Sequence, residues 1–555
     1  MLHFHYFCKI FFLFFSFCRV QYKQLLDMCG FTVYTGSDKM LKLSVAHDFK
    51  KVKYRGPDNS HTEDYGENGW MGFHRLKIID ISNNGNQPLV HKHIHLVCNG
   101  EIYNYKKLRE KYHKTFDFKS DSDCEVIIPL LLDKGLIKTA RELDAEFVFV
   151  IYDADKRKFY AGRDPVGIRP MFYGYSRFGE ISFASEMKAL HNICSVIKPF
   201  PPGHVYDGEK FVCYRDIGHV KNFSSHEIDE ACLNIKRLLT KGVAKRLQAD
   251  VPIGFLCSGG LDSSLVCSIA ARILDKPIRT FAVGIDIDPI DTKYARIVAD
   301  YLGADHTEVL FPKQDIFDIL STLIYNLETW DITTIRASMG MYIVSKYISE
   351  NTDIKVLMTG EISDEIFGYK YTDFAPSPEE FQKEAVKRIR EIYMYDVLRA
   401  DRCISSNGLE ARVPFGDLDF VEYVMSIRPE LKMNFTGIGK YLLRKSFEGD
   451  HLPHDILYRE KAAFSDAVGH SVVNSLKAYA EELYSEMDLF LSQVRYKHAP
   501  PISKESLMYR NIFEQHFSGR APLIIDFWMP NKEWENCNVN DPSARVLPNY
   551  GKSGE

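Results

Sequence analysis

The sequence has few cysteines and lacks a long apolar run. Its 12 cysteines are spread over 555 residues, and no two of them follow the Cys-x-x-Cys spacing. A disulfide-rich secreted scaffold is therefore excluded, and no structural zinc site is indicated. The apolar stretch at residues 10–18 has nine residues, whereas a membrane-spanning helix needs about 20. We expect a reducing environment and a cytoplasmic location.

The sequence also lacks a charge excess, an internal repeat and a low-complexity segment. Lysine and arginine number 70, aspartate and glutamate number 75, and the net charge is -5. This balance excludes a strongly basic nucleic-acid-binding protein, so we expect no nucleic-acid partner. Hydrophobic residues make up 45% and charged residues 26% of the chain, as in soluble globular proteins. The length predicts roughly two to four domains.

Residues 1–27 differ in composition from the rest of the chain. Their apolar stretch lies between Lys9 and Arg19, and no small-residue cleavage site follows it. Three interpretations stay open: a start codon assigned too early, a targeting or anchoring segment, or an extension that is removed by processing. We expect no membrane contact unless this segment is retained.

The remaining sequence divides into two parts with different patterns. Residues 29–210 contain short segments rich in aromatic and β-branched residues, which predict strands at 147–153, 158–162, 171–175 and 181–184. Residues 224–530 alternate between helical and strand patterns. The predicted helices are 227–247, 264–274, 293–302 and 316–327, and the predicted strands are 253–257, 278–284, 307–311 and 354–358.

Such alternation predicts a doubly wound parallel sheet, whose ligands bind at the carboxyl ends of the strands. Further helices are predicted at 382–400 and 471–484. Residues 531–555 are rich in Asn, Pro and Gly, which predicts a frayed tail.

A glycine- and serine-rich loop connects the strand at 253–257 to the next helix. It reads Ser258-Gly259-Gly260-Leu261-Asp262-Ser263-Ser264. Two glycines let the backbone approach a phosphate, and the positive end of a helix favours an anion. Asp262 would repel phosphate on its own, so it indicates a bridging Mg²⁺. The lysine of the Walker A motif is absent, so this is a different class of nucleotide loop.

The loop resembles the pyrophosphate-binding loop of the ATP pyrophosphatases. Residues 328–338 (ETWDITTIRAS), 410–415 (EARVPF) and 464–469 (FSDAVG) narrow the resemblance to the glutamine-hydrolysing asparagine synthetases, from Met28 to about Pro548. It implies an α+β four-layer N-terminal-nucleophile glutaminase domain followed by an α/β doubly wound adenylating domain. ATP, Mg²⁺, aspartate and glutamine are the implied small molecules, and a homodimer is compatible with the resemblance.

The resemblance also implies roles in the glutaminase half. Cys29 would be the nucleophile once it is N-terminal, with its own α-amino group as the base; Met28 followed by a small residue suits removal by an aminopeptidase, which favours a start codon assigned too early. Asn99 and Gly100 would form the oxyanion hole. Arg75 would bind the α-carboxylate of glutamine, and Asp123 its ammonium. Further substrate contacts are implied at Leu76, Lys77, Ile78, Ile79 and Glu101.

In the synthetase half the implied roles are spread along the chain. Glu361 would accept a proton from ammonia. Asp262 and Asp364 would hold Mg²⁺ and pyrophosphate, and Lys440 would neutralise phosphate charge. Contacts with ATP are implied at Leu256, Ser258, Gly259, Gly260, Ser263, Ser264, Val283, Thr359 and Gly360. Contacts with the intermediate and the ammonia path are implied at Thr333, Thr334 and Arg336.

The loop at residues 359–369 departs from the family pattern. Ile362 stands where the family usually has glycine, and the segment before Tyr369 is one residue short. If position 362 has a positive φ, isoleucine is strained there. Other functions therefore stay open: a glutaminase with an altered synthetase half, an amidotransferase that uses another carboxylate, or a non-enzymatic binding protein.

Overall fold

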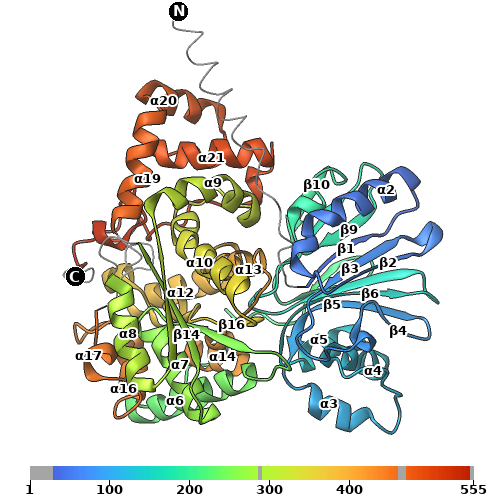
Figure 1. Ribbon diagram of the computed structural model, residues 1–555, viewed down its shortest axis with the longest axis horizontal. Helices are drawn as coiled ribbons and strands as arrows, with labels where there is room; N and C mark the ends of the chain where they lie inside the picture. The colour runs from blue at the N-terminus through green and yellow to red at the C-terminus, as the bar shows by residue number, and fades with distance from the viewer. Residues whose placement is uncertain (1–28, 286–289, 461–469, 551–555) are drawn as a thin grey trace, which may run out of the picture.

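The computed structural model describes residues 29–285, 290–460 and 470–550, and it consists of two domains (Figure 1). The predicted motif at 464–469 lies outside these residues. Within the described ranges, no helix has both the length and the apolar character that crossing a membrane requires.

The N-terminal domain contains two antiparallel sheets packed face to face. Their strand orders are β10-β8-β9-β1-β3-β2 and β12-β11-β7-β6-β5-β4. Phe31 and Val33 from the first sheet meet Val97, Val148 and Val150 from the second in a core between them. The strands are β1 (Gly30–Tyr34), β2 (Asn59–Asp64), β3 (Trp70–Arg75), β4 (Leu89–His91), β5 (Ile94–Ile102), β6 (Ala145–Asp153), β7 (Lys158–Arg163), β8 (Phe172–Tyr175), β9 (Ile181–Ala184), β10 (Val196–Pro199), β11 (His204–Tyr206) and β12 (Phe211–Cys213).

Helices cover the outer faces of these two sheets and complete four layers. One face carries α2 (Lys39–Asp48), and the other carries α3 (Tyr105–Tyr112), α4 (Ile127–Lys134) and α5 (Leu136–Glu142) (Figure 1). Every residue of β6 is buried, because this strand is central in its sheet and covered on both sides. The four-layer α+β fold that we predicted is confirmed.

The second domain is built around a five-stranded parallel sheet with the order β15-β14-β13-β16-β17. The strands β14 and β15, which follow β13 in the chain, lie on one side of it, and β16 and β17 lie on the other side. The order therefore reverses between β13 and β16, which is where such sheets bind ligands. The predicted doubly wound fold is confirmed. The strands are β13 (Ile253–Leu256), β14 (Arg279–Ile285), β15 (Asp305–Phe311), β16 (Val356–Met358) and β17 (Glu410–Arg412).

Helices surround this sheet and extend the domain beyond it (Figure 1). They are α6 (Ile228–Arg246), α7 (Leu261–Leu274), α8 (Ile290–Leu302), α9 (Lys313–Leu327), α10 (Ile332–Asn351), α11 (Ser363–Phe367), α12 (Pro378–Glu391), α13 (Asp396–Ser405), α14 (Leu418–Ser426), α15 (Pro429–Lys432), α16 (Tyr441–Ser446), α17 (His454–Leu457), α19 (His470–Leu483), α20 (Glu486–Arg495) and α21 (Lys504–His516).

Several elements differ from the sequence prediction. Helix α7 begins at Leu261, directly after the extended Gly260, so Asp262 lies in its first turn. The helix predicted at 382–400 is two helices, because the backbone at Tyr395 (φ -123°, ψ -99°) is not helical. Helix α10 and strand β17 were not predicted. Asp331 accepts a hydrogen bond from the Thr334 N–H and caps α10.

The prediction of a frayed tail is wrong for residues 531–550. Trp534, Cys537 and Leu547 are buried in a cluster with Tyr371, and Asp541 forms an ion pair with Arg336. The apolar side chains spaced through this Asn- and Pro-rich segment fix it against the domain.

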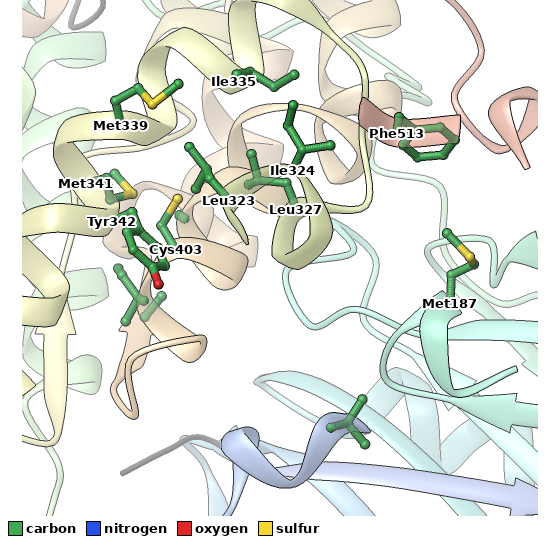
Figure 2. Packing of buried hydrophobic residues seen from close by; sticks show 14 of the residues in the cluster. Met187, Leu323, Ile324, Leu327, Ile335, Met339, Met341, Tyr342, Cys403 and Phe513 are labelled. Atoms are coloured by element: carbon green, nitrogen blue, oxygen red, sulfur yellow. The ribbon is translucent and has the colours of Figure 1, made fainter. Parts of the chain in front are cut away.

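The two domains share a buried interface of charged and apolar side chains. Arg55 donates hydrogen bonds to both carboxylate oxygens of Asp401 at 2.9 and 3.0 Å, and Arg402 lies 2.6 Å from Glu186. Met187 belongs to an apolar cluster whose members come from both domains. Figure 2 shows this cluster, with members from α9, α10, α13 and α21. Removing one partner of a buried ion pair leaves an unpaired buried charge, which strongly destabilises the protein. These pairs therefore fix the arrangement of the two domains.

A buried lysine in the second domain gives a pH-dependent stability. Burial lowers the pKa of Lys432 to about 7. Among the residues that the structure describes, its ammonium group has only the Val424 carbonyl (3.1 Å) and the Gln382 side-chain oxygen (3.3 Å) as hydrogen-bond acceptors. Between about pH 7 and the ordinary pKa of about 10.4, the unfolded chain holds one more proton than the folded chain. Lys432 therefore makes the protein more stable as the pH rises through this window.

We expect Lys432→Met to be more stable than the wild type at pH 7, with a difference that shrinks towards pH 10. Chemical denaturation of both proteins between pH 6 and pH 10 measures this difference. A difference that does not change with pH would show that Lys432 has the same protonation state in the folded and the unfolded protein.

Candidate active sites

The first candidate site surrounds Cys29, immediately before β1. The thiol of Cys29 accepts a hydrogen bond from the Leu76 N–H at 3.3 Å and lies 3.5 Å from the Leu76 carbonyl. Arg55 Nε donates to the carbonyl of Cys29 at 3.0 Å. Burial raises the pKa of the Cys29 thiol to about 12, so at neutral pH it is a thiol and needs a base to become a nucleophile.

Asn99 on β5 has a buried side chain without a partner. Neither its oxygen nor its nitrogen has a hydrogen-bond partner among the residues that the structure describes. Leaving such a group unpaired costs about 1–3 kcal/mol, so a ligand that pairs with it recovers this energy. The next residue must be glycine, because a Cβ at Gly100 would lie 2.3 Å from the Glu146 carbonyl oxygen.

Two buried carboxyl groups lie at the end of the same strand. Asp123 accepts a hydrogen bond from the Ile102 N–H at 2.7 Å, and burial raises its pKa to about 6. A bound ammonium group would favour its charged form. Glu101 forms an ion pair of 3.0 Å with Arg412 on β17, so it lies at the domain interface.

The predicted carboxylate ligand Arg75 is already well paired. Its guanidinium donates to the Ser82 carbonyl at 2.7 Å and to Asn86 Oδ1 at 2.9 Å, and also to the carbonyls of Ile79 and Asp80. It therefore orders the loop after β3 that carries the predicted contacts at residues 76–79. Of these, Leu76 and Ile78 are buried, whereas Lys77 is partly exposed.

The second candidate site is a cavity of about 210 Å³ at the carboxyl ends of β13, β14 and β16. It lies at the point where the strand order reverses. Eleven residues predicted from the sequence line it: Leu256, Ser258, Gly260, Asp262, Ser263, Val283, Thr333, Thr359, Gly360, Glu361 and Asp364.

The glycine-rich loop is shaped by close backbone contacts. Gly259 has a φ of +70°, and a Cβ there would lie 2.5 Å from the backbone of Tyr294. A Cβ at Gly360 would lie 2.8 Å from the backbone nitrogen of Ser263. The two loops therefore touch at the start of α7, whose positive end is at the cavity and favours an anion.

Lys440 brings the two predicted metal ligands together. Its ammonium group lies 2.9 Å from Asp262 and 2.6 Å from Asp364, and it donates to Ser363 Oγ at 2.9 Å. Lys440 itself has a φ of +56°. Two carboxylates that share one cation also fit a magnesium ion, which takes one or two protein carboxylates and completes its shell with phosphate and water.

Seven charged residues that line the cavity were missed from the sequence, and three of them, Arg399, Asp396 and Glu365, lie beside Glu361 or one another. Arg399 pairs with Glu361, and also with Asp396 at 2.8 Å. Glu365 bonds to Asp396, and its pKa is raised well above the ordinary value by burial and by these acidic neighbours. Arg399 and Asp396 have a spacing typical of an ion pair on a helix, which is the only signal that the sequence offered.

Two predicted contacts have structural partners instead. Thr334 is bonded to Asp331 as part of the α10 cap. Arg336 is buried in ion pairs with Glu505 and Asp541. Neither residue lines the cavity. Gly259, Ser264 and Lys440 are also absent from its lining, although Lys440 contacts the lining residues Asp262 and Asp364.

Ile362 adopts the backbone conformation that disfavours isoleucine. Its φ is +85°, and its side chain is buried. A Cβ at Gly416 would lie 2.8 Å from the Cδ1 atoms of both Ile362 and Ile168, so the isoleucine side chain anchors the loop against the domain interface. Strain of about 1–3 kcal/mol is thus held in the loop that carries Glu361 and Asp364.

Each half of the chain matches a known protein family. Residues 28–203 match a family model described as a glutamine amidotransferase domain, and residues 234–540 match one described as asparagine synthase. The chain is 41% identical to a probable glutamine-hydrolysing asparagine synthetase of Acanthamoeba polyphaga mimivirus, over 94% of this chain and 100% of the viral protein. It is 40% and 39% identical to glutamine-hydrolysing asparagine synthetases of Homo sapiens and Gallus gallus, over 94% of this chain and 99% of each relative.

Proposed function

The chain belongs to the glutamine-hydrolysing asparagine synthetases, and we propose that it makes asparagine from aspartate with ammonia taken from glutamine. The reaction is ATP + L-aspartate + L-glutamine + water to L-asparagine + L-glutamate + AMP + diphosphate. The observation that carries this proposal is the cavity at the strand reversal, where Lys440 joins Asp262 and Asp364. Of the alternatives from the sequence, none is favoured by a specific observation.

In the glutaminase half, the thiol of Cys29 gives its proton to the α-amino group of the same residue and attacks the amide carbon of glutamine. The Asn99 side chain and the Gly100 N–H stabilise the oxyanion. Ammonia leaves, and water releases glutamate from the thioester. The unpartnered, buried amide of Asn99 supports this assignment, and the charged form of Asp123 would pair with the ammonium of glutamine.

This chemistry requires a free amino group on Cys29. We expect a protein that starts at Cys29 after loss of Met28 to hydrolyse glutamine, and a protein that keeps residues 1–28 not to do so. The blocked nitrogen would be an amide, which is not a base. Intact mass and glutaminase rate, measured on the same sample, test this; full activity in the uncleaved form would contradict it.

In the synthetase half, the β-carboxylate of aspartate attacks the α-phosphorus of ATP, which gives β-aspartyl-AMP and releases diphosphate. Ammonia then displaces AMP, and Glu361 accepts the proton. Arg399 holds the Glu361 carboxylate in place. The ammonium group of Lys440 and the positive end of α7 would stabilise the negative charge of the phosphates.

Asp262 and Asp364 are the residues that would hold Mg²⁺. The ion would neutralise charge on the departing diphosphate. Both carboxylates contact the same ammonium group, so Lys440 would share them with the ion or move onto a phosphate.

A coupled assay tests the proposed reaction. Release of diphosphate should require ATP, Mg²⁺ and aspartate, and asparagine should form with either glutamine or ammonium chloride. Diphosphate release that does not depend on aspartate, or that depends on another carboxylic acid, would show that aspartate is not the substrate.

Ile362→Gly should raise the rate of aspartate-dependent diphosphate release. Glycine relieves a strain of about 1–3 kcal/mol at positive φ, and a shift of about 1 Å at reacting groups can change the rate roughly 100-fold. The same change removes a buried side chain, which costs about 2–5 kcal/mol of stability, so we expect a lower melting temperature.

Ile362→Ala is the matched control for this prediction. Alanine also removes most of the side chain but keeps the backbone penalty. A gain in rate with glycine and none with alanine would assign the effect to the backbone. Equal rates in all three proteins would show that the strain does not reach the reacting groups.

A further inference from the structure

Helix α13 of the second domain reaches the first candidate site through one arginine. The Arg55 side chain is fully buried, and its Nε donates a hydrogen bond to the carbonyl oxygen of Cys29 at 3.0 Å. Its two terminal nitrogens donate to the two carboxylate oxygens of Asp401 at 2.9 and 3.0 Å, and Nη1 also donates to Ser405 Oγ at 2.9 Å. Asp401 and Ser405 both belong to α13, which lies at the side of its domain that faces the N-terminal domain (Figure 1).

We propose that Asp401 is a positioning residue of the glutaminase site, although it belongs to the other domain. Asp401 holds the guanidinium group of Arg55, and Arg55 in turn holds the carbonyl group of Cys29. The inference rests on the proposed function, in which Cys29 is the nucleophile and its own α-amino group is the base. It adds a residue of the second domain to a reaction whose other proposed groups come from the first domain.

The carbonyl group of Cys29 matters because an N-terminal residue is held by the chain from one side only. Once residues 1–28 are removed, no peptide bond precedes Cys29. The peptide group between Cys29 and Gly30 is planar, so a hydrogen bond to its oxygen fixes the direction in which the Cα atom of Cys29 leaves the strand. The thiol and the α-amino group are both attached to this Cα atom and move with it. A displacement of about 1 Å at reacting groups can change the rate roughly 100-fold.

Asp401 can fix this guanidinium group because it contacts both of its terminal nitrogens. A guanidinium group is planar and presents its N–H groups in a rigid fork. A carboxylate that accepts from both terminal nitrogens sets the orientation of the plane, and the Nε–H then points at the carbonyl oxygen of Cys29. Glu186 also accepts from Nη1 at 2.6 Å, but it is shared with Arg402 at 2.6 Å and Lys188 at 2.8 Å. Glu186 therefore contributes charge, whereas Asp401 contributes orientation.

The same helix also supports the second site. Arg399, two positions before Asp401 on α13, pairs with Glu361, which is the proposed proton acceptor. Neighbouring residues of one helix thus hold a group of each reaction. Ammonia released from glutamine is useful only when an acceptor site is present. A glutaminase site that depends on α13 is complete only while the second domain is docked against the first.

Steady-state glutaminase kinetics test the proposal on protein that has lost residues 1–28, with glutamate release measured in the absence of ATP and aspartate. Asp401→Ala should lower kcat roughly 10- to 100-fold. The KM for glutamine should stay nearly unchanged, because the proposed glutamine ligands are intact. Asp401→Asn keeps one acceptor oxygen, so it should show a smaller loss in the same direction. This milder variant still tests the proposal if Asp401→Ala does not fold.

Arg246→Met is the matched control for a loosened domain interface. Arg246 on α6 forms a buried ion pair of 2.7 Å with Glu146 on β6, so this change also removes one partner of an ion pair between the domains. The hydrogen bonds of Arg246 go to Glu146, Gly242 and Asp417 rather than to the Cys29 site. The variant should have a lower melting temperature and the wild-type kcat. An equal loss of kcat in Arg246→Met and Asp401→Ala would assign the effect to the interface as a whole and overturn the proposal.

Alkylation of Cys29 by iodoacetamide separates its position from its reactivity. The reagent diffuses to the thiol and requires only the thiol and the α-amino base, which belong to one residue, and not their alignment with the oxyanion hole. The mass of the N-terminal peptide should therefore show the same alkylation rate in the wild type and in Asp401→Ala.

Two results would overturn the inference and leave the proposed function standing: alkylation that falls in proportion to kcat in Asp401→Ala, or a kcat of this variant equal to that of the wild type. A wild type that does not hydrolyse glutamine would overturn the proposed function and the inference together.

Discussion

Cys29→Ala is expected to abolish glutamine hydrolysis and to leave asparagine synthesis from free ammonia intact. The thiol is the only proposed nucleophile of the first site, so we expect the glutaminase rate to fall by at least about 1,000-fold. The synthetase cavity is lined by residues from the second domain, and alanine removes only a side chain that contacts Leu76.

Two assays on one sample measure this result, and they require protein that has lost residues 1–28. Glutamate release reports the first site, and diphosphate release with ammonium chloride reports the second. Cys29→Ser is the control, since a hydroxyl keeps the contacts with Leu76 but is a weaker nucleophile. If ammonia-dependent synthesis were lost equally in a folded Cys29→Ala variant, the proposed division of labour would be wrong.

Asp262→Ala should remove the ATP-dependent reaction and spare glutamine hydrolysis. Asp262 lies in the first turn of α7 and contacts Lys440 at 2.9 Å, and Ser363 donates a hydrogen bond to it at 2.7 Å. Loss of this carboxylate weakens Mg²⁺ binding and frees the lysine. An electrostatic contribution of several kcal/mol corresponds to roughly 100-fold or more in rate.

The dependence on metal concentration separates this role from a structural one. Asp262→Asn keeps the shape of the side chain but not its charge, so it should need a higher Mg²⁺ concentration for half-maximal rate. Both variants should hydrolyse glutamine like the wild type. Unchanged diphosphate release in Asp262→Ala would overturn the assignment of this loop to the nucleotide.

Local patterns in the sequence predicted the alternation of strands and helices in the second domain, whereas the four-layer fold of the first domain and most of the residues expected in the cavity came from the resemblance to a known family. Strand and helix periodicity depends on neighbours in the chain, so it gave the alternation that places residues 258–264 and 359–364 at strand ends. A parallel sheet then brings those ends to one edge, and eleven predicted residues line the cavity there. The proposed nucleophile Cys29 was predicted from the resemblance alone, which its contiguous motif from Met28 to Phe31 made readable.

Contacts between distant segments were decided only by the tertiary structure. Asp262 and Lys440 are 178 positions apart, and Arg399 on α13 approaches Glu361, which lies in the turn before α11. Arg336 has the charge to bind a substrate, but Glu505 and Asp541 neutralise it in the folded protein. The sequence shows that an arginine is present, whereas its partner depends on which helices pack together.

The backbone conformation of Ile362 is a further feature that only the tertiary structure decided. Its identity was readable from the sequence, but the positive φ of +85° and the contact with Gly416 were not. A β-branched residue prefers negative φ, so its local preference opposes the observed loop. Packing against Gly416 and Ile168 at the domain interface holds it there, because burial of the side chain, about 1.5–3 kcal/mol, offsets a strain of about 1–3 kcal/mol.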